Sequence, residues 1–110
     1  MANLSSEEFK TQIDSFDNEM IIDVRHIDLK RDIIIENALY IPTRNDLIQF
    51  IDTLDRETPI FVYCAIGERS IAACKMLCEM GFQNISNLKK GIEEWEQKGY
   101  KVVNLEKEKQ

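Results

Sequence analysis

The sequence predicts an α/β domain in which a parallel sheet carries helices on both of its faces. Short apolar runs of strand length stand at 20–24, 38–41 and 60–63, and an alternating run stands at 84–88. Segments with apolar residues at helical spacing lie between these runs. Strands that alternate with helices pair in parallel through right-handed crossovers, and the functional loops then lie beyond the carboxyl ends of the strands.

Composition excludes several classes of protein. The 110 residues suffice for a single domain, which we place at 1–110 with an ordered core at about 4–104. A formal charge of −6 argues against nucleic-acid binding, and no apolar run approaches the roughly 18 residues of a membrane span. The acidic start does not resemble a signal peptide, and three sparsely spaced cysteines fit a reducing compartment. We therefore expect a cytoplasmic monomer.

The first helix is expected to begin after Ser5 and to end at about Ser15. Ser5 is a good N-cap, Glu8 is its capping-box partner, and Leu4 can pack against Phe9 as a hydrophobic staple. The residues expected to face inward are Phe9, Ile13 and Phe16.

The run at 20–24 is a predicted strand that contains one acid, Asp23. A buried carboxylate is costly unless it is paired, so Asp23 is a candidate partner for a cation in a nearby loop. Residues 28–32 are expected to form a loop or a single helical turn, and Asn37 a left-handed turn.

Pro42 ends the predicted strand at 38–41 because it has no N–H to donate to the sheet. Thr43 or Asn45 can cap the helix that follows. The apolar face of that helix is expected to carry Leu47, Phe50, Ile51 and Leu54.

The run at 60–63 is a predicted buried strand, and a helix with an apolar face formed by Ala73, Met76, Leu77 and Met80 follows it. Gly81 and Gly99 are expected to end helices in the left-handed conformation. The run at 84–88 is the last strand candidate, and the helix after it carries Ile92 and Trp95. The charged tail at 106–110 is expected to fray.

Cys64 stands where a strand passes into a helix, and this position favours a nucleophile. N–H groups at a helix N-terminus lack internal partners and stabilise an anion such as a thiolate. Gly67 permits the positive φ that a tight anion-binding loop needs, Arg69 adds a permanent cation, and Ser70 starts the helix. The alternative is that Cys64 is a small buried hydrophobe at the end of a core strand.

These motifs, in this order and spacing, resemble a single rhodanese homology domain, a family of sulfurtransferases that handle thiosulfate and persulfides. The resemblance covers 20–103. It rests on Ile22-Asp23-Val24-Arg25, Ala38-Leu39-Tyr40-Ile41-Pro42 and Val62-Tyr63-Cys64-Ala65-Ile66-Gly67-Glu68-Arg69-Ser70, followed by Gly81-Phe82, Asn87-Leu88, Gly91-Ile92, Trp95 and Gly99.

The resemblance implies a five-stranded parallel sheet and a sulfurtransferase activity without a cofactor. Cys64 would carry sulfane sulfur as a persulfide, from thiosulfate or another persulfide donor to a thiol or cyanide acceptor. The implied partners are a small sulfur-donor anion or a protein persulfide, and a protein sulfur acceptor. The residues that would bind the substrate are Ala65, Ile66, Gly67, Glu68, Arg69 and Ser70.

Four further residues are candidates for supporting roles: Asp23, Arg25, Lys89 and Lys90. The lysine pair can restore cationic character at the mouth of the loop, which Glu68 makes more negative; the alternative is a solvated pair of lysines in a turn. Many family members carry a Gly-His-Ile-Pro-Gly-Ala stretch where this chain has residues 33–38, so that turn is expected to be built differently.

The other cysteines do not indicate a metal site. Cys74 and Cys78 lie four residues apart on one helix face, with too few further ligands at suitable spacing for zinc. We expect Cys74 to be half-buried and Cys78 to be a surface thiol. His26 is expected to be an exposed loop residue.

Two other classes of function stay open. One is a non-catalytic rhodanese-like module that binds a partner or relays sulfur. The other is a phosphatase or arsenate reductase, which loop length disfavours: four residues separate Cys64 from Arg69, whereas tyrosine phosphatases place five there.

Overall fold

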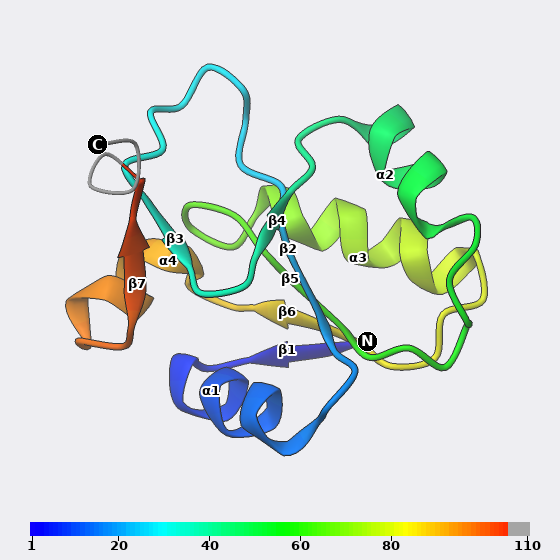
Figure 1. Ribbon diagram of the computed structural model, residues 1–110, viewed down its shortest axis with the longest axis horizontal. Coiled ribbons are helices and arrows are strands. Elements are labelled where there is room, and N and C mark those ends of the chain that lie inside the picture. The colour runs from blue at the N-terminus through cyan, green and yellow to red at the C-terminus, as the bar shows by residue number, and fades with distance from the viewer. Residues whose placement is uncertain (106–110) are drawn as a thin grey trace.

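The computed structural model describes residues 1–105 and consists of four helices and seven strands (Figure 1). The helices are α1 (Ser6–Ser15), α2 (Arg44–Ile51), α3 (Arg69–Glu79) and α4 (Gly91–Gln97). The strands are β1 (Ala2–Leu4), β2 (Met20–Asp23), β3 (Ile33–Ile35), β4 (Leu39–Tyr40), β5 (Ile60–Tyr63), β6 (Ile85–Leu88) and β7 (Val102–Asn104). The predicted tail at 106–110 lies outside the described residues.

Five strands form one parallel sheet in the order β1-β6-β5-β2-β4, which confirms the predicted fold class. β5 lies at the centre, where Ile22 of β2 is opposite Val62 and Ile60 is opposite Ile85. The two remaining strands, β3 and β7, pair antiparallel in a separate small sheet. The predicted strand at 84–88 is confirmed as β6, but it is not the last strand, because β7 follows it.

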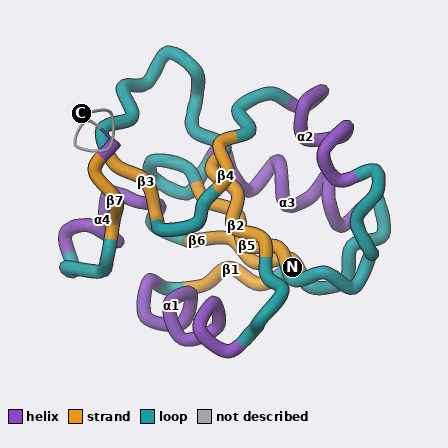
Figure 2. The backbone as a smooth tube through the Cα atoms, viewed as in Figure 1, coloured by secondary structure: helices purple, strands orange, loops and turns teal. Residues whose placement is uncertain are grey.

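The helices cover the two faces of the sheet (Figure 2). Residues of β5 alternate between two core clusters: Ile60 and Val62 pack on the side of α2 and α3, whereas Phe61 and Tyr63 pack on the side of α1 and α4. On the second side Trp95 and Phe9 are in edge-to-face contact, with ring centroids 5.7 Å apart. The four residues of β5 are all buried, as expected for a central parallel strand.

Most of the predicted helix ends are confirmed. Ser5 caps α1, with both hydrogen bonds of the capping box to Glu8 present. Thr43 rather than Asn45 caps α2, since its hydroxyl accepts the N–H of Asp46. Positive φ occurs at the predicted glycines after α3 and α4 and at Asn37.

Three predictions for single side chains were wrong. Phe16 is 38% exposed, because it lies just beyond the end of α1, where its ring is tilted against that of Phe61 with the centroids 6.1 Å apart. Leu54 lies after α2, which ends three residues earlier, although it still packs against the core. Cys74 is fully buried rather than half-buried, because it faces the sheet beside β6.

Within residues 1–105 no helix is both long and apolar enough to cross a bilayer.

Candidate active site

Cys64 directly follows β5, and α3 begins five residues later at Arg69. The loop 64–68 turns tightly enough that two backbone N–H groups point at the cysteine sulfur. The N–H of Gly67 donates to Sγ at 3.2 Å, and that of Ser70 donates to the same atom at 3.4 Å. Residue Cys64 is 2% exposed and belongs to the core on the side of α2 and α3.

The hydroxyl of Ser70 completes the surroundings of the sulfur. Ser70 Oγ lies 3.2 Å from Cys64 Sγ and 3.3 Å from the carbonyl oxygen of Gly67. A hydroxyl has one proton and two acceptor positions. When the sulfur is a thiol, S–H can donate to Ser70 while Ser70 donates to Gly67; when the sulfur is a thiolate, the hydroxyl proton can turn toward it.

Two glycines let the loop lie directly on the chain between β6 and α4. A Cβ on Gly67, whose φ is +96°, would lie 2.0 Å from the carbonyl oxygen of Lys89. A Cβ on Gly91 would lie 2.1 Å from the carbonyl oxygen of Ala65. This close packing allows the N–H of Ile92 to donate to the carbonyl of Cys64 at 3.0 Å. The start of α4 therefore packs against the loop 64–68 and fixes its backbone by this hydrogen bond.

The side chain of Asn87, in β6, also hydrogen-bonds to the loop. Its Nδ2 donates to the carbonyl of Gly67 at 3.3 Å and to Oδ1 of Asn3 at 3.0 Å. The side chain is fully buried, and its Oδ1 has no hydrogen-bond partner among the described residues. A buried amide with one unpaired oxygen costs free energy, which its two donated bonds offset.

Arg69 bonds to two other loops. Its Nε donates to the carbonyl of Val24 at 2.8 Å, and its Nη2 donates to the carbonyl of Pro42 at 2.9 Å. Arg69 thus joins the chain segments that follow β2 and β4 to the first turn of α3.

Asp23 and Arg25 form a buried ion pair beneath these loops. Arg25 Nη2 lies 2.7 Å from Asp23 Oδ2, and the side chains are 6% and 0% exposed. Tyr63 Oη donates to the same carboxylate oxygen at 3.1 Å and accepts the N–H of Ile35. Burial alone would lower the pKa of Arg25, but the hydrogen bond and charge of Asp23 outweigh it, so that pKa is raised.

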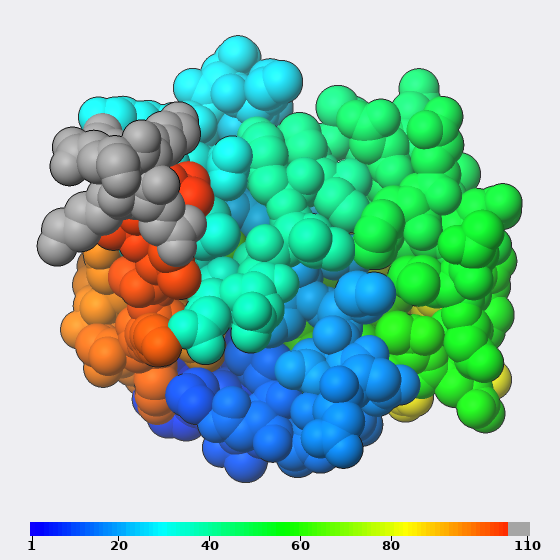
Figure 3. All heavy atoms as spheres, viewed as in Figure 1, coloured from blue at the N-terminus to red at the C-terminus, as the bar shows by residue number. Residues whose placement is uncertain are grey.

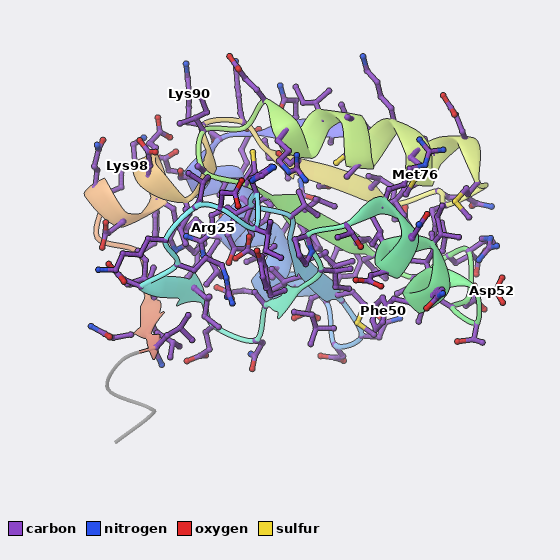
Figure 4. All side chains as sticks on the ribbon, turned by 90° about the horizontal axis from the view of Figure 1, so that it is seen from above. Arg25, Phe50, Asp52, Met76, Lys90 and Lys98 are labelled. Atoms are coloured by element: carbon purple, nitrogen blue, oxygen red, sulfur yellow. The ribbon has the colours of Figure 1, made fainter. Side chains whose placement is uncertain are left out.

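The remaining predicted residues lie at the surface. Ile66, Glu68, Lys89 and Lys90 are exposed, and Figure 4 shows Lys90 at the outside of the fold and Arg25 within it. Lys89 lies close enough to Glu8 for its charge to contribute to lowering the pKa of that carboxyl. The loop after β2 stands at the top of the molecule and exposes Ile27 and Leu29 (Figure 3). His26 is exposed there, and its Nδ1 accepts the backbone N–H of Asp28.

The other two cysteines differ in burial. Burial raises the pKa of the Cys74 thiol to about 12, whereas Cys78 is half-buried. Across residues 1–105 no group of three histidine, cysteine or acidic side chains could hold a metal ion.

Sequence reasoning missed Asn87 and the N–H groups of α4 as parts of this site. The signal for Asn87 was weak: it is one of two adjacent polar residues, with Ser86, in a short predicted strand that also contains Ile85 and Leu88. The contribution of Ile92 carries no such signal, since a backbone N–H is common to every residue type except proline.

Comparison with known proteins identifies similar chains. A family model described as the rhodanese-like domain matches residues 5–98. A thiosulfate sulfurtransferase, GlpE of Coxiella burnetii, is 34% identical over 76 residues, which cover 69% of this chain and 70% of the relative. The protein YrkF of Bacillus subtilis is 28% identical over 92 residues, and the chain spans about half of its length, 49%.

A crystal structure of a rhodanese-related protein from Thermoplasma volcanium has the same fold. Its TM-score is 0.76 at 29% sequence identity, with 94% of this chain and 98% of that chain covered.

Proposed function

Because the chain belongs to the rhodanese-like domain family, we propose that it is a sulfurtransferase that carries sulfane sulfur as a persulfide on Cys64. The observation that carries the proposal is the pair of backbone N–H groups, from Gly67 and Ser70, that point at one sulfur atom. Converging N–H donors form an anion-binding site, and the thiolate is the form of cysteine that attacks sulfur. A cysteine that only fills space needs no such donors.

The proposed reaction has two displacement steps. The Cys64 thiolate attacks the sulfane sulfur of thiosulfate, a new S–S bond forms, and sulfite leaves with the electron pair of the broken bond. The outer sulfur of the persulfide is then attacked by an acceptor thiolate or cyanide, which takes that sulfur and returns the Cys64 thiolate. Neither step needs a general base if both nucleophiles arrive ionised.

Thiosulfate is one donor, and a protein persulfide is another. The name of the Coxiella burnetii relative supports thiosulfate. The exposed carboxylate of Glu68 opposes a dianion in the loop, and Arg69 directs its Nε and Nη2 to the carbonyls of Val24 and Pro42, in the segments after β2 and β4. These charges favour a donor with less negative charge than thiosulfate.

One observation favours a second function, a rhodanese-like module that binds a partner without turnover. Residue Cys64 is only 2% exposed, as a small core hydrophobe would be. In this case Ile66, which is 52% exposed at the tip of the loop, would contact the partner instead.

Loading with sulfur separates the two functions. The protein is incubated with thiosulfate, and separately with a low-molecular-weight persulfide, and its intact mass is measured before and after reduction. We expect the wild type to gain one reducible sulfur atom. The Cys64→Ser variant should gain none, and Cys78→Ser, which removes a half-buried cysteine elsewhere, should load like the wild type.

Each other outcome has a definite meaning. No gain with either donor favours the binding module, whereas an equal gain in the Cys64→Ser variant refutes Cys64 as the carrier. Turnover of a phosphate ester would instead support a phosphatase.

A further inference from the structure

A groove of about 190 Å³ lies between α2 and α3, on the same side of the sheet as Cys64. Its floor is apolar and comes from both helices and from the ends of β2 and β4; Met76, in its wall, is labelled on α3 in Figure 4. The hollow exists because α3 presents two of the smallest side chains there, Ala72 and Ala73, opposite Leu47 of α2. Cys64 is not among the lining residues.

The charges at this groove are opposite to those of the whole chain. The protein carries 20 acidic and 14 basic residues, yet the two charged residues that line the groove are both arginines, Arg44 and Arg69. Arg44 is exposed and has no ion-pair or hydrogen-bond partner among the described residues. Arg69 uses Nε and Nη2 for the carbonyls of Val24 and Pro42, which leaves N–H groups of its guanidinium for another acceptor.

An apolar hollow with two guanidinium groups matches one class of ligand. We propose that the groove binds a small monocarboxylate with a hydrocarbon body of about five or six carbons. A cavity of about 150 Å³ holds a benzene molecule, so a groove of 190 Å³ has room for a body of this size. The carboxylate pairs with Arg44 and with the remaining N–H groups of Arg69, and the hydrocarbon lies against Leu47 and Met76.

The inference does not depend on sulfur transfer, because the hydrogen-bond partners of Cys64 Sγ, Gly67 and Ser70, do not line the groove. It does connect the ligand to the candidate site, since Arg69 is the first residue of α3 and directly follows the loop 64–68. A ligand bound to Arg69 therefore contacts the same side chain that hydrogen-bonds to the segments after β2 and β4.

Binding is tested by titrating hexanoate into uniformly ¹⁵N-labelled protein at constant ionic strength and following amide chemical shifts. We expect saturable shifts at residues of the groove. Across the series from butyrate to hexanoate, each added CH₂ should tighten binding by about three- to fourfold, because each buries about one further methylene. Hexan-1-ol, which has the same chain without the charge, should bind about tenfold more weakly.

Two variants and one control locate the site. Arg44→Gln should weaken hexanoate binding by about three- to fivefold, the value of a partly exposed ion pair. Ala72→Leu should abolish it by filling the hollow at an exposed helix position. Lys75→Gln removes an equal charge from α3 outside the groove and should bind like the wild type.

The proposal fails if hexan-1-ol binds as tightly as hexanoate, if Arg44→Gln and Lys75→Gln have equal effects, or if the shifts lie away from the groove. The spectra of the variants themselves report whether each has folded. Sulfur loading of Cys64 plays no part in the measurement, so the failure of one proposal leaves the other intact.

Discussion

At the scale of single residues, Tyr63 bonds to two polar groups inside the core, of which the N–H of Ile35 has no other partner among the described residues. Its hydroxyl donates to Asp23 and accepts the backbone N–H of Ile35, and the residue is fully buried. Burial and the charge of Asp23 both raise the pKa of Tyr63, so the hydroxyl keeps its proton and stays a donor. The Asp23–Arg25 pair is joined to β3 at this oxygen atom and also by Arg25, whose Nη2 donates to the carbonyl of Ile33 at 2.6 Å.

Removing the Tyr63 hydroxyl should therefore lower the free energy of unfolding by more than the loss of one ordinary hydrogen bond does. We expect Tyr63→Phe to lower the free energy of unfolding by about 1–3 kcal/mol, because it leaves a buried N–H without a partner. Urea unfolding measures the change. Tyr40→Phe is the matched control: its hydroxyl donates to the carbonyl of Arg25 from a half-buried position, and its loss should cost about 0.5–1 kcal/mol. Equal costs for the two variants would contradict this account.

The part of the site that is local in sequence could be predicted at this scale. The step from strand to helix at Cys64 and the glycine three residues later are enough to indicate N–H groups around the sulfur. The direction of Arg69 could not be predicted, because its acceptors are carbonyls 45 and 27 residues away, and every residue has a carbonyl. The pairing of Asp23 with Arg25 was only a candidate, since two residues of opposite charge at this spacing are common in solvated loops.

At the scale of elements, two acidic residues at the N-terminal end of α1 make hydrogen bonds that depend on their charge. Glu8 closes the capping box with Ser5, and Glu7 pairs with Lys98, which follows α4, at 2.6 Å. The pKa of Glu8 is lowered by the backbone N–H of Ser5 and then by its hydroxyl, and that of Glu7 mainly by its bond to Lys98. The folded state therefore favours the ionised form of both carboxyls.

The free energy of unfolding should therefore fall at acidic pH. A carboxyl whose pKa is lower in the folded than in the unfolded state stabilises the fold above its ordinary pKa, 4.5, and this stabilisation is lost as the pH falls through the lowered value. We expect the urea midpoint of the wild type to fall between pH 5 and pH 3. In Glu8→Gln that fall should be smaller, because one of the two contributing carboxyls is gone.

Glu79→Gln serves as the control, since Glu79 is exposed on α3 and has no ion-pair partner among the described residues. Its midpoint should fall as steeply as that of the wild type. If the urea midpoint of Glu8→Gln falls with pH as steeply as that of the wild type, the capping box does not contribute to the pH dependence.

Elements with local signals were predictable, and those that depend on distant pairing were not. The caps of α1 and α2 and the glycines after α3 and α4 follow from neighbouring residues. β3 and β7 have three residues each and pair across about 70 positions of sequence, so neither has a periodic pattern of its own. β1 was missed for the same reason, since it has three residues and pairs with β6, more than 80 positions later in the sequence.

At the scale of the whole molecule, the candidate site depends on α4, which begins 27 residues after Cys64. The N–H groups of Ile92 and Glu93 bind the carbonyls of Cys64 and Ala65, and Gly91 leaves room for that contact. Any change that moves the start of α4 should therefore move the loop around the sulfur.

Gly91→Ala tests this dependence, and Gly99→Ala is its matched control. Both glycines have positive φ, but a Cβ on Gly91 meets the backbone of Ala65, whereas a Cβ on Gly99 meets nothing within 4 Å. We expect Gly99→Ala to cost about 1–2 kcal/mol from backbone strain alone. Gly91→Ala should cost at least about 3 kcal/mol and should shift the amide resonances of residues 64–70. If the two variants lose equal stability, the contact with Ala65 does not hold the loop.

The groups that hydrogen-bond to the sulfur are mostly main-chain N–H groups, and this has a consequence for how the domain can diverge. The side chains of Ile66 and Glu68 project outward while the peptide groups of the same loop face the cysteine or its supports. Mutations at these outward positions can accumulate over generations and change which molecules are admitted, without disturbing the atoms that would stabilise the anion. Substitutions at positions 66 and 68 can thus change which ligands the loop binds, while Gly67 and Gly91 are retained because a Cβ there would meet backbone atoms.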